Sequence, residues 1–128
     1  MIHVDGSAID RILLEKWEPD RTLAMSAIAY AEAIRGATFK PADGFLIAKA
    51  DVARGIISSH IFPFTRDIAE IFADLSPRRT GGQQARDLMI AATAIAHGAP
   101  LATNDRQMAA LHGANVPGHA PLDIMYIE

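Results

Sequence analysis

Short apolar runs that end at a polar residue, each followed by apolar residues at helical spacing, constrain the fold of this chain more than any other feature. Ile2–Val4 is such a run and ends at Asp5. Residues 100–103 form another, which delivers Asn104 and Asp105. A strand followed by a helix can join a parallel neighbour, because the helix carries the chain back over the sheet. The alternation therefore predicts an α/β domain with a mostly parallel central sheet.

Three further runs extend this pattern. Residues 23–25 form a second short apolar run, and residues 124–127 can complete the sheet as an edge strand. Residues 56–62 carry enough β-branched and aromatic side chains for a third strand, which Pro63 would stop. We therefore expect all of these runs to belong to one sheet.

The segments between the runs have the spacing and capping residues of helices. Ser26 is suited to cap a helix over residues 27–37. This helix is apolar almost all round and is expected to be largely buried. Thr65 is suited to cap a later helix, which Ser76 and Pro77 would end. The helices therefore fill the positions between strands that an α/β fold requires.

The remaining segments are less distinctive. A polar connection over residues 78–84 leads into a helix over Ala85–Ala96, and Gly98 is suited to the C-terminal cap of that helix. Residues 39–54 contain a turn and are otherwise predicted to be helical. The pattern of residues 39–54 indicates no function.

The composition fits one globular domain. The chain has 128 residues, of which 50% are hydrophobic, so we expect residues 1–128 to form a single domain with a real core. No apolar run approaches the roughly 20 residues that cross a bilayer, and no secretion signal is evident. The chain has no cysteine, which fits a reducing cytoplasm and excludes disulfides and thiolate ligands. A metal would have to bind through oxygen or imidazole.

Four acidic residues lie inside or at the end of strongly apolar stretches. They are Asp5, Glu32, Asp87 and Asp105. A carboxylate removed from water is costly unless a cation or several hydrogen-bond donors compensate it. Four carboxylates drawn toward one place would therefore call for a metal ion.

The topology permits these carboxylates to meet. In a parallel α/β sheet, ligands bind beyond the carboxyl ends of the strands, where Asp5 and Asp105 are expected. Right-handed crossovers can bring Glu32 and Asp87 to the same edge on their helices. Mg²⁺ and Mn²⁺ favour such oxygen ligands together with several waters, and water on these ions can attack a phosphodiester. Clustered carboxylates without a cation would also have raised pKa values.

The charge balance is compatible with binding to nucleic acid. The net charge is −3, but without the four candidate carboxylates eleven acids remain against twelve Lys and Arg. Several arginines flank the candidate residues and suit bidentate phosphate contacts. They are Arg78, Arg79, Arg86 and Arg106. Solvated charges at helix ends would explain the same arginines.

Each acidic residue also has a plainer interpretation. Asp5 and Asp105 can cap the helices that follow them. Asp87 can complement a helix dipole, and Glu32 can pair with Arg35 three residues later. The occurrence of all four in this order along the chain favours a shared site.

Four segments that contain these acidic residues share a recognisable pattern. They are Val4-Asp5-Gly6-Ser7, Ser26-Ala27-Ile28-Ala29-Tyr30-Ala31-Glu32, Asp87-Leu88-Met89-Ile90-Ala91-Ala92 and Leu101-Ala102-Thr103-Asn104-Asp105. The pattern resembles the PIN-domain nucleases, most closely the VapC-type toxins, over essentially the whole chain. The resemblance implies a three-layer α/β/α fold and a Mg²⁺- or Mn²⁺-dependent endoribonuclease acting on RNA. It also implies a homodimer and a cognate VapB-like antitoxin that binds DNA.

The resemblance also assigns roles to residues. The acidic quartet of the family maps onto Asp5, Glu32, Asp87 and Asp105, of which all except Glu32 are expected to hold the metal. Glu32 would complete the second position or orient water. Ser7 and Thr103 occupy places where the family often has a supporting hydroxyl. Gly6 is a departure, because the family usually has Thr or a similar residue there.

Two functional hypotheses follow from these observations. The first is a metal-dependent endoribonuclease in which the quartet activates water for in-line attack at an RNA phosphate. The second is a non-catalytic α/β regulatory module whose acidic pocket binds a cation or an arginine of a partner. Activity measured after removal of any partner would distinguish them.

Overall fold

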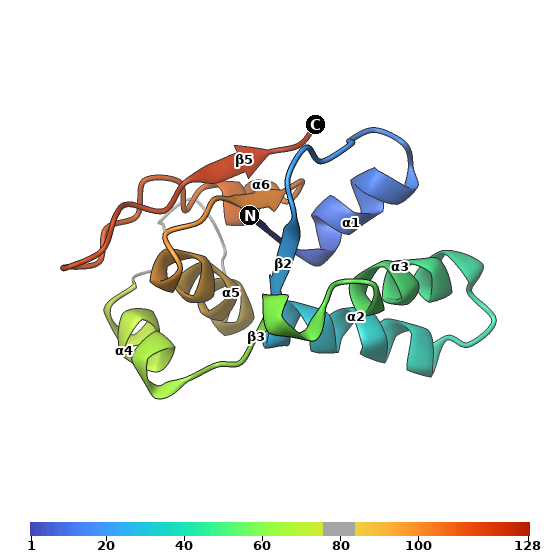
Figure 1. Ribbon diagram of the computed structural model, residues 1–128, viewed down its shortest axis with the longest axis horizontal. Coiled ribbons are helices and arrows are strands. Elements are labelled where there is room, and N and C mark those ends of the chain that lie inside the picture. The colour runs from blue at the N-terminus through green and yellow to red at the C-terminus, as the bar shows by residue number, and fades with distance from the viewer. Residues whose placement is uncertain (76–83) are drawn as a thin grey trace.

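Five parallel strands form the centre of the molecule. The computed structural model describes residues 1–75 and 84–128. The strands are β1 (Ile2–Val4), β2 (Leu23–Ser26), β3 (Ile61–Phe62), β4 (Leu101–Thr103) and β5 (Ile124–Tyr126). Their order in the sheet is β3-β2-β1-β4-β5, and every neighbouring pair is parallel (Figure 1). The predicted parallel sheet, including its edge strand, is confirmed.

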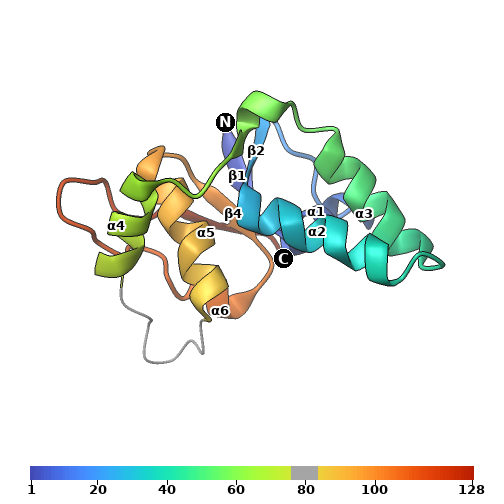
Figure 2. The ribbon, with the colours of Figure 1, turned by 90° about the horizontal axis from the view of Figure 1, so that it is seen from below.

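Helices cover both faces of the sheet. The helices of the described residues are α1 (Gly6–Leu13), α2 (Ala27–Phe39), α3 (Gly44–Arg54), α4 (Arg66–Asp74), α5 (Ala85–Ala96) and α6 (Arg106–Ala109). Helices α1 and α3 lie on one side, and α4 and α5 lie together on the other (Figure 2). Helix α2 leaves the end of β2 and packs along α3. This three-layer α/β/α arrangement confirms the predicted fold class.

Helices bury the central strands on both faces. Every residue of β1 and β4 is buried, so these strands read as continuous apolar runs without alternation. The two polar exceptions are His3 in β1 and Thr103 in β4. All strands run in the same direction, so the residues that follow β1, β2 and β4 emerge at one edge of the sheet.

Helix starts follow the predicted caps. Ser26 accepts a hydrogen bond from Ala29 N at 3.0 Å, and Thr65 accepts one from Ile68 N at 3.3 Å. Each bond satisfies one of the free N–H groups in the first turn of its helix. Gly98 has a φ of +58°, which is the left-handed conformation expected after α5.

Two sequence predictions about secondary structure and burial are wrong. The strand predicted over residues 56–62 is limited to Ile61–Phe62 and is preceded by a 3₁₀ turn, Ser58–His60. Ile57 is 60% exposed, so its β-branched side chain has no sheet neighbour to pack against. Helix α2 is not largely buried: only Ala29 and Ala33 of its residues are buried. Its apolar composition therefore faces the surface as well as the core.

The remaining predictions concern residues 39–54, the end of the helix that Thr65 caps, and membrane-spanning segments. Residues 44–54 are helical, as predicted. The expected end of a helix at Ser76 and Pro77, and the connection with Arg78 and Arg79, fall in 76–83 and lie outside the described residues. No helix in the described part of the chain is long and apolar enough to span a membrane.

Candidate active site

The four predicted carboxylates line one cavity of about 200 Å³ at the carboxyl edge of the sheet. They come from four separate places in the fold: the residue after β1, helix α2, the first turn of α5 and the second residue after β4. In that order they are Asp5, Glu32, Asp87 and Asp105. The structure thus brings together side chains that the sequence separates by up to a hundred positions.

Asp5 is the most buried and most strongly hydrogen-bonded of the four. Its Oδ1 accepts from Ser7 Oγ at 2.7 Å and from Ala8 N at 3.0 Å. Its Oδ2 accepts from Thr103 Oγ1 at 2.5 Å. The carboxylate therefore both caps α1 and is fixed in orientation by two hydroxyls, which confirms the capping interpretation without removing Asp5 from the site.

The hydroxyls of Ser7 and Thr103 join the ends of β1 and β4. Their oxygens lie 3.1 Å apart. Ser7 Oγ accepts from Asn104 N at 2.8 Å, and Thr103 Oγ1 accepts from Asp105 N at 3.0 Å. These two side chains therefore place the backbone that carries Asp105 against the one that carries Asp5, as expected for supporting hydroxyls.

Asp87 and Asp105 each cap a helix and also line the cavity. Asp87 Oδ2 accepts from Gln84 N at 3.0 Å at the start of α5. Asp105 Oδ1 accepts from Gln107 N at 2.9 Å at the start of α6. Each bond uses one lone pair of one oxygen, so both carboxylates keep lone pairs for a cation.

Glu32 pairs with a different arginine from the one the sequence suggested. Its Oε2 lies 3.5 Å from Arg86 Nη1, an arginine that precedes Asp87 and lines the same cavity. Arg35 instead lies over the ring of Phe39, at 4.3 Å from the ring centroid. Tertiary contact between α2 and α5 therefore replaces the predicted pairing within one helix.

Burial and mutual repulsion shift the titration of two of these groups. Burial raises the pKa of Asp5, and the negative charge of Asp105 raises it further against the hydrogen bonds that lower it. Burial likewise raises the pKa of Glu32, with Arg86 lowering it and Asp87 and Asp5 raising it. The negative charges of neighbouring carboxylates thus make Asp5 and Glu32 harder to ionise.

Lys49 is a member of the cavity that the sequence did not reveal. It lies on α3, in the segment 39–54 that carried no functional pattern, and its Nζ is 2.8 Å from Asp10 Oδ1. A side chain at Gly6 would meet it, since a Cβ there would lie 3.1 Å from Nζ. No sequence spacing links Lys49 to the acidic residues, because the contact depends on how α3 packs against α1.

The donor set fits a hydrated divalent ion. Among the residues that the structure describes, no three acidic or histidine side chains form a ready-made metal cage. Mg²⁺ and Mn²⁺ do not require one, because Mg²⁺ binds proteins through one or two carboxylates and retains several waters. The electrostatic coupling of Asp5 with Asp105 and of Glu32 with Asp87 indicates a cavity in which a cation would relieve repulsion.

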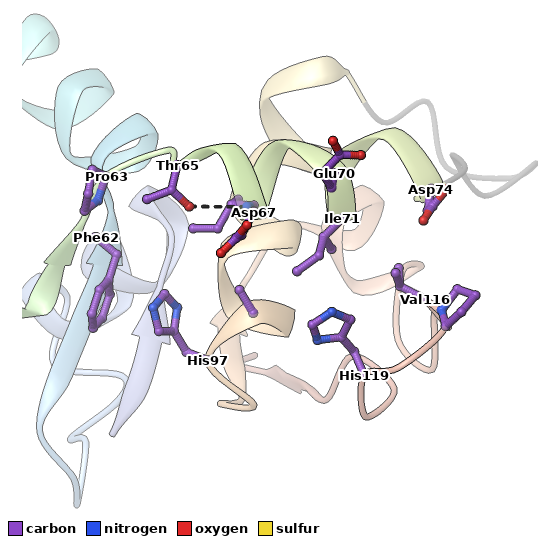
Figure 3. A pocket seen from close by; sticks show the side chains of 13 residues that line it. Phe62, Pro63, Thr65, Asp67, Glu70, Ile71, Asp74, His97, Val116 and His119 are labelled. Carbon is purple, nitrogen blue, oxygen red and sulfur yellow. Dashed lines mark hydrogen bonds between the residues drawn. The ribbon is translucent and has the colours of Figure 1, made fainter.

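A larger cavity, of about 600 Å³, lies elsewhere and contains none of the four carboxylates. It lies between α4, the end of α5 and the segment near Val116 (Figure 3). Three acidic side chains of α4 line it, and His97 and His119 lie on its other side. The acidic residues are Asp67, Glu70 and Asp74. Size alone does not identify the chemical site, because the hydrogen-bonded carboxylates and their cationic neighbours gather in the smaller cavity.

A comparison with models of known protein families found a match that covers most of this chain. The model described as PIN domain matches residues 2–113. A comparison with curated proteins gave no match.

Several solved structures have the same fold over nearly the whole chain. VapBC-5 from Mycobacterium tuberculosis, a member of the VapBC family of toxin–antitoxin systems, is 27% identical, with a TM-score of 0.67 and coverage of 98% of this chain and 97% of the other. VapBC2 from Rickettsia felis, bound to a promoter DNA fragment, is 22% identical, with a TM-score of 0.67 and 100% coverage of both chains. A toxin–antitoxin complex from Klebsiella pneumoniae is 22% identical, with a TM-score of 0.62 and coverage of 100% and 98%.

Proposed function

Because the chain belongs to the PIN domain family, we propose that it is the toxin of a VapBC-like toxin–antitoxin pair and acts as a divalent-metal-dependent endoribonuclease. The observation that carries this proposal is the convergence of four carboxylates from β1, α2, α5 and β4 on one cavity. A purely structural role would satisfy each carboxylate separately and would not require them to face one another.

We assign metal binding to three of the carboxylates. Asp5, Asp87 and Asp105 would hold Mg²⁺ or Mn²⁺, directly or through water, with their helix-capping bonds fixing the side chains. The bound ion supplies Lewis acidity, which makes a water more acidic and offsets charge on the phosphate.

Glu32 is suited to a different task. It is the least tightly fixed of the four, with an ion pair to Arg86 as its contact in the described residues. Its pKa is raised, first by partial burial, which makes the carboxylate a better proton acceptor than a free glutamate in water. We assign Glu32 the orientation and deprotonation of the attacking water, and Arg86 a contact with RNA phosphate at the cavity mouth.

The test uses purified protein that has been freed of any partner. It is incubated with structured and single-stranded RNAs in Mg²⁺, in Mn²⁺ and in chelator. Asp87→Asn should abolish cleavage, whereas Asp67→Asn, a change of the same kind in the first turn of α4, should not. Equal cleavage by the wild type and Asp87→Asn would exclude the proposed catalytic site.

A protein partner is the second part of the proposed function. Large apolar side chains are exposed on the α2–α3 pair, including Phe39, Phe45 and Ile47. Solved relatives are complexes of toxin with antitoxin, and an arginine of such a partner could replace a cation against the carboxylates. We propose that a VapB-like antitoxin covers this surface and blocks cleavage. Co-expression with a candidate VapB-like antitoxin, followed by co-purification, tests the proposal.

We also propose a homodimer and a cytoplasmic location. The resemblance to VapC-type proteins implies the dimer, and the absence of cysteine fits a reducing compartment. Light scattering on the purified chain measures the first, and cell fractionation measures the second. A monomer at all accessible concentrations would contradict the dimer.

The alternative is a regulatory module that binds without turnover. Two cations, Lys49 and Arg86, already lie in the cavity and could balance its carboxylates without chemistry. In that case Mg²⁺ would raise the melting temperature while no RNA is cut. The cleavage experiment above therefore separates the two functions.

A further inference from the structure

Lys49 is a cation inside the carboxylate cavity that neither metal binding nor the acidic quartet accounts for. Its side chain is 18% exposed and lines the same cavity as the four carboxylates. Burial of a lysine side chain costs conformational entropy and hydration, so its retention in this position calls for a role.

Asp10 holds the ammonium in place. Lys49 Nζ lies 2.8 Å from Asp10 Oδ1, which ties α3 to α1. The contact is an ion pair, and an ammonium group has three N–H donors, of which this pair can occupy at most one. Lys49 can therefore remain bound to Asp10 and still donate to an oxygen of a ligand in the cavity.

Gly6 makes room for this arrangement. A Cβ at position 6 would lie 3.1 Å from Lys49 Nζ and 3.2 Å from its Cε. These distances are tighter than ordinary van der Waals contacts, so a larger residue would require the ammonium to shift by a few tenths of an ångström. The glycine next to Asp5 and the lysine from α3 thus fit each other, and the departure from the family at Gly6 has a structural counterpart.

The negative charge of the cavity gives the Lys49 ammonium a role in binding an anionic ligand. A phosphodiester entering a cavity lined by four carboxylates is repelled, and a metal ion bound by those carboxylates offsets only part of that charge. Lys49 is a fixed positive charge whose presence does not depend on the metal.

We infer that Lys49 is a phosphate-binding residue of this site, held by Asp10 and admitted by Gly6, which contacts the RNA backbone beside the carboxylates. This inference rests on the proposed ribonuclease function. It assigns to α3 a part in substrate binding that its sequence pattern does not indicate. Asp10 acts through Lys49 and is a positioning residue.

The test measures RNA binding in chelator, where metal-dependent cleavage cannot occur. Fluorescence anisotropy with short labelled single-stranded RNAs of mixed sequence gives the affinity at several salt concentrations. Each phosphate contact contributes about 0.7 to the salt slope for single strands. Lys49→Met should lower the slope by about that amount and weaken binding on the order of tenfold. Lys49→Arg should retain both.

Lys16→Met is the matched control, because Lys16 is exposed and outside the cavity. It should leave the salt slope unchanged. A slope that is unaffected by Lys49→Met, or lowered equally by Lys16→Met, would overturn the inference. If Lys49→Met does not fold, Lys49→Gln provides the second variant, since it removes the same charge but keeps a polar end group, and it should reduce the slope as well.

The two proposals fail in different ways. If cleavage requires Asp87 but Lys49→Met leaves the salt slope unchanged, the ribonuclease proposal stands. Lys49 is then excluded as a phosphate contact. If no RNA is cut under any metal condition, the ribonuclease proposal fails. The anisotropy series then still decides whether Lys49 binds phosphate, because it requires no turnover.

Discussion

Thr103 Oγ1 donates a hydrogen bond of 2.5 Å to Oδ2 of Asp5, although 98 positions separate the two residues in the sequence. The same hydroxyl oxygen accepts from Asp105 N at 3.0 Å. One buried side chain on β4 therefore positions two of the proposed metal ligands at once. The geometry of the site depends on how β4 lies against β1.

Thr103→Val should weaken metal binding without disrupting the fold. The change keeps the shape of the side chain, but it leaves Asp5 Oδ2 and Asp105 N without their partner. Loss of such a supporting hydrogen bond typically weakens metal affinity by about 10- to 100-fold. Stability should fall by about 1–2 kcal/mol. Mn²⁺ titration by calorimetry and urea unfolding measure the two effects.

Thr93→Val is the control for that variant. Thr93 is also buried, on α5, and its hydroxyl donates to Met89 O at 2.9 Å away from the cavity. It should leave Mn²⁺ affinity unchanged. Equal Mn²⁺ affinity in the wild type and Thr103→Val would show that the hydroxyl does not position the ligands.

Asp5→Asn should stabilise the protein in chelator. The pKa of Asp5 is raised above 3.8, first by burial, so the folded protein binds this proton more tightly than the unfolded chain. Stability therefore decreases as the pH rises through the folded pKa and remains lower at neutral pH. Asparagine keeps an acceptor for the cap and removes the charge. We expect a gain of about 1 kcal/mol, which raises the melting temperature by about 4 °C.

Mg²⁺ should reverse the order of stability, so that the wild type becomes more stable than Asp5→Asn. A ligand at 100 times its dissociation constant adds about 2.7 kcal/mol to the protein that binds it. The wild type should gain this stabilisation, and Asp5→Asn should gain little. Asp43→Asn, a change in the exposed cap of α3, is the control and should respond to Mg²⁺ like the wild type. A lower melting temperature for Asp5→Asn in chelator would contradict the predicted charge repulsion.

The parts of the fold set by local chemistry were predictable from the sequence. Ile2–Val4 and the residues around Leu101 read as strands because burial on both faces makes them continuously apolar. Ser26 and Thr65 cap helices because short polar side chains satisfy free N–H groups. The prediction of a strand over residues 56–62 failed because the chain forms a 3₁₀ turn at Ser58–His60 and leaves Ile57 exposed, so only Ile61–Phe62 pairs with the sheet.

Tertiary contacts decided the rest of the site. The positions of Asp5 and Asp105 followed from the rule that strand ends share an edge, and those of Glu32 and Asp87 from right-handed crossovers. The pairing of Glu32 with Arg86 did not, since it depends on the approach of α2 to α5. Lys49 could not be found by spacing, because only the packing of α3 on α1 brings it to Asp10.

Gly98 allows a prediction about the helix that carries Asp87. Its φ is +58°, and nothing lies within 4 Å of the position a Cβ would occupy. The cost of Gly98→Ala should therefore come from the backbone alone and be about 1 kcal/mol. Gly98→Asn should cost less, because asparagine tolerates this conformation. Urea unfolding of both variants measures the difference, and equal costs would point to a lost contact instead of backbone strain.

His3 should make the metal-free protein sensitive to acid. It is 1% exposed in β1, stacks on Phe62 and His97 at ring-centroid distances of 5.4 Å, and its Nε2 has no hydrogen-bond partner among the described residues. Burial first, together with the positive charges of His97 and of the N-terminus, lowers the pKa of His3 to about 4. The folded protein therefore holds this ring neutral, whereas the unfolded chain takes up a proton near pH 6.5.

The resulting pH dependence has a definite sign and window. Stability is fully present above about pH 6.5 and is lost as the pH falls toward about 4, because only the unfolded state gains the proton in that range. The expected loss near pH 5 is about 1–2 kcal/mol. His3→Phe keeps the stacked ring and should remove this loss, whereas His119→Gln, at an exposed position, should retain it. Urea unfolding in chelator at about pH 7 and about pH 5 measures both. Acid sensitivity that persists in His3→Phe would assign it to the carboxylate cavity or to another histidine.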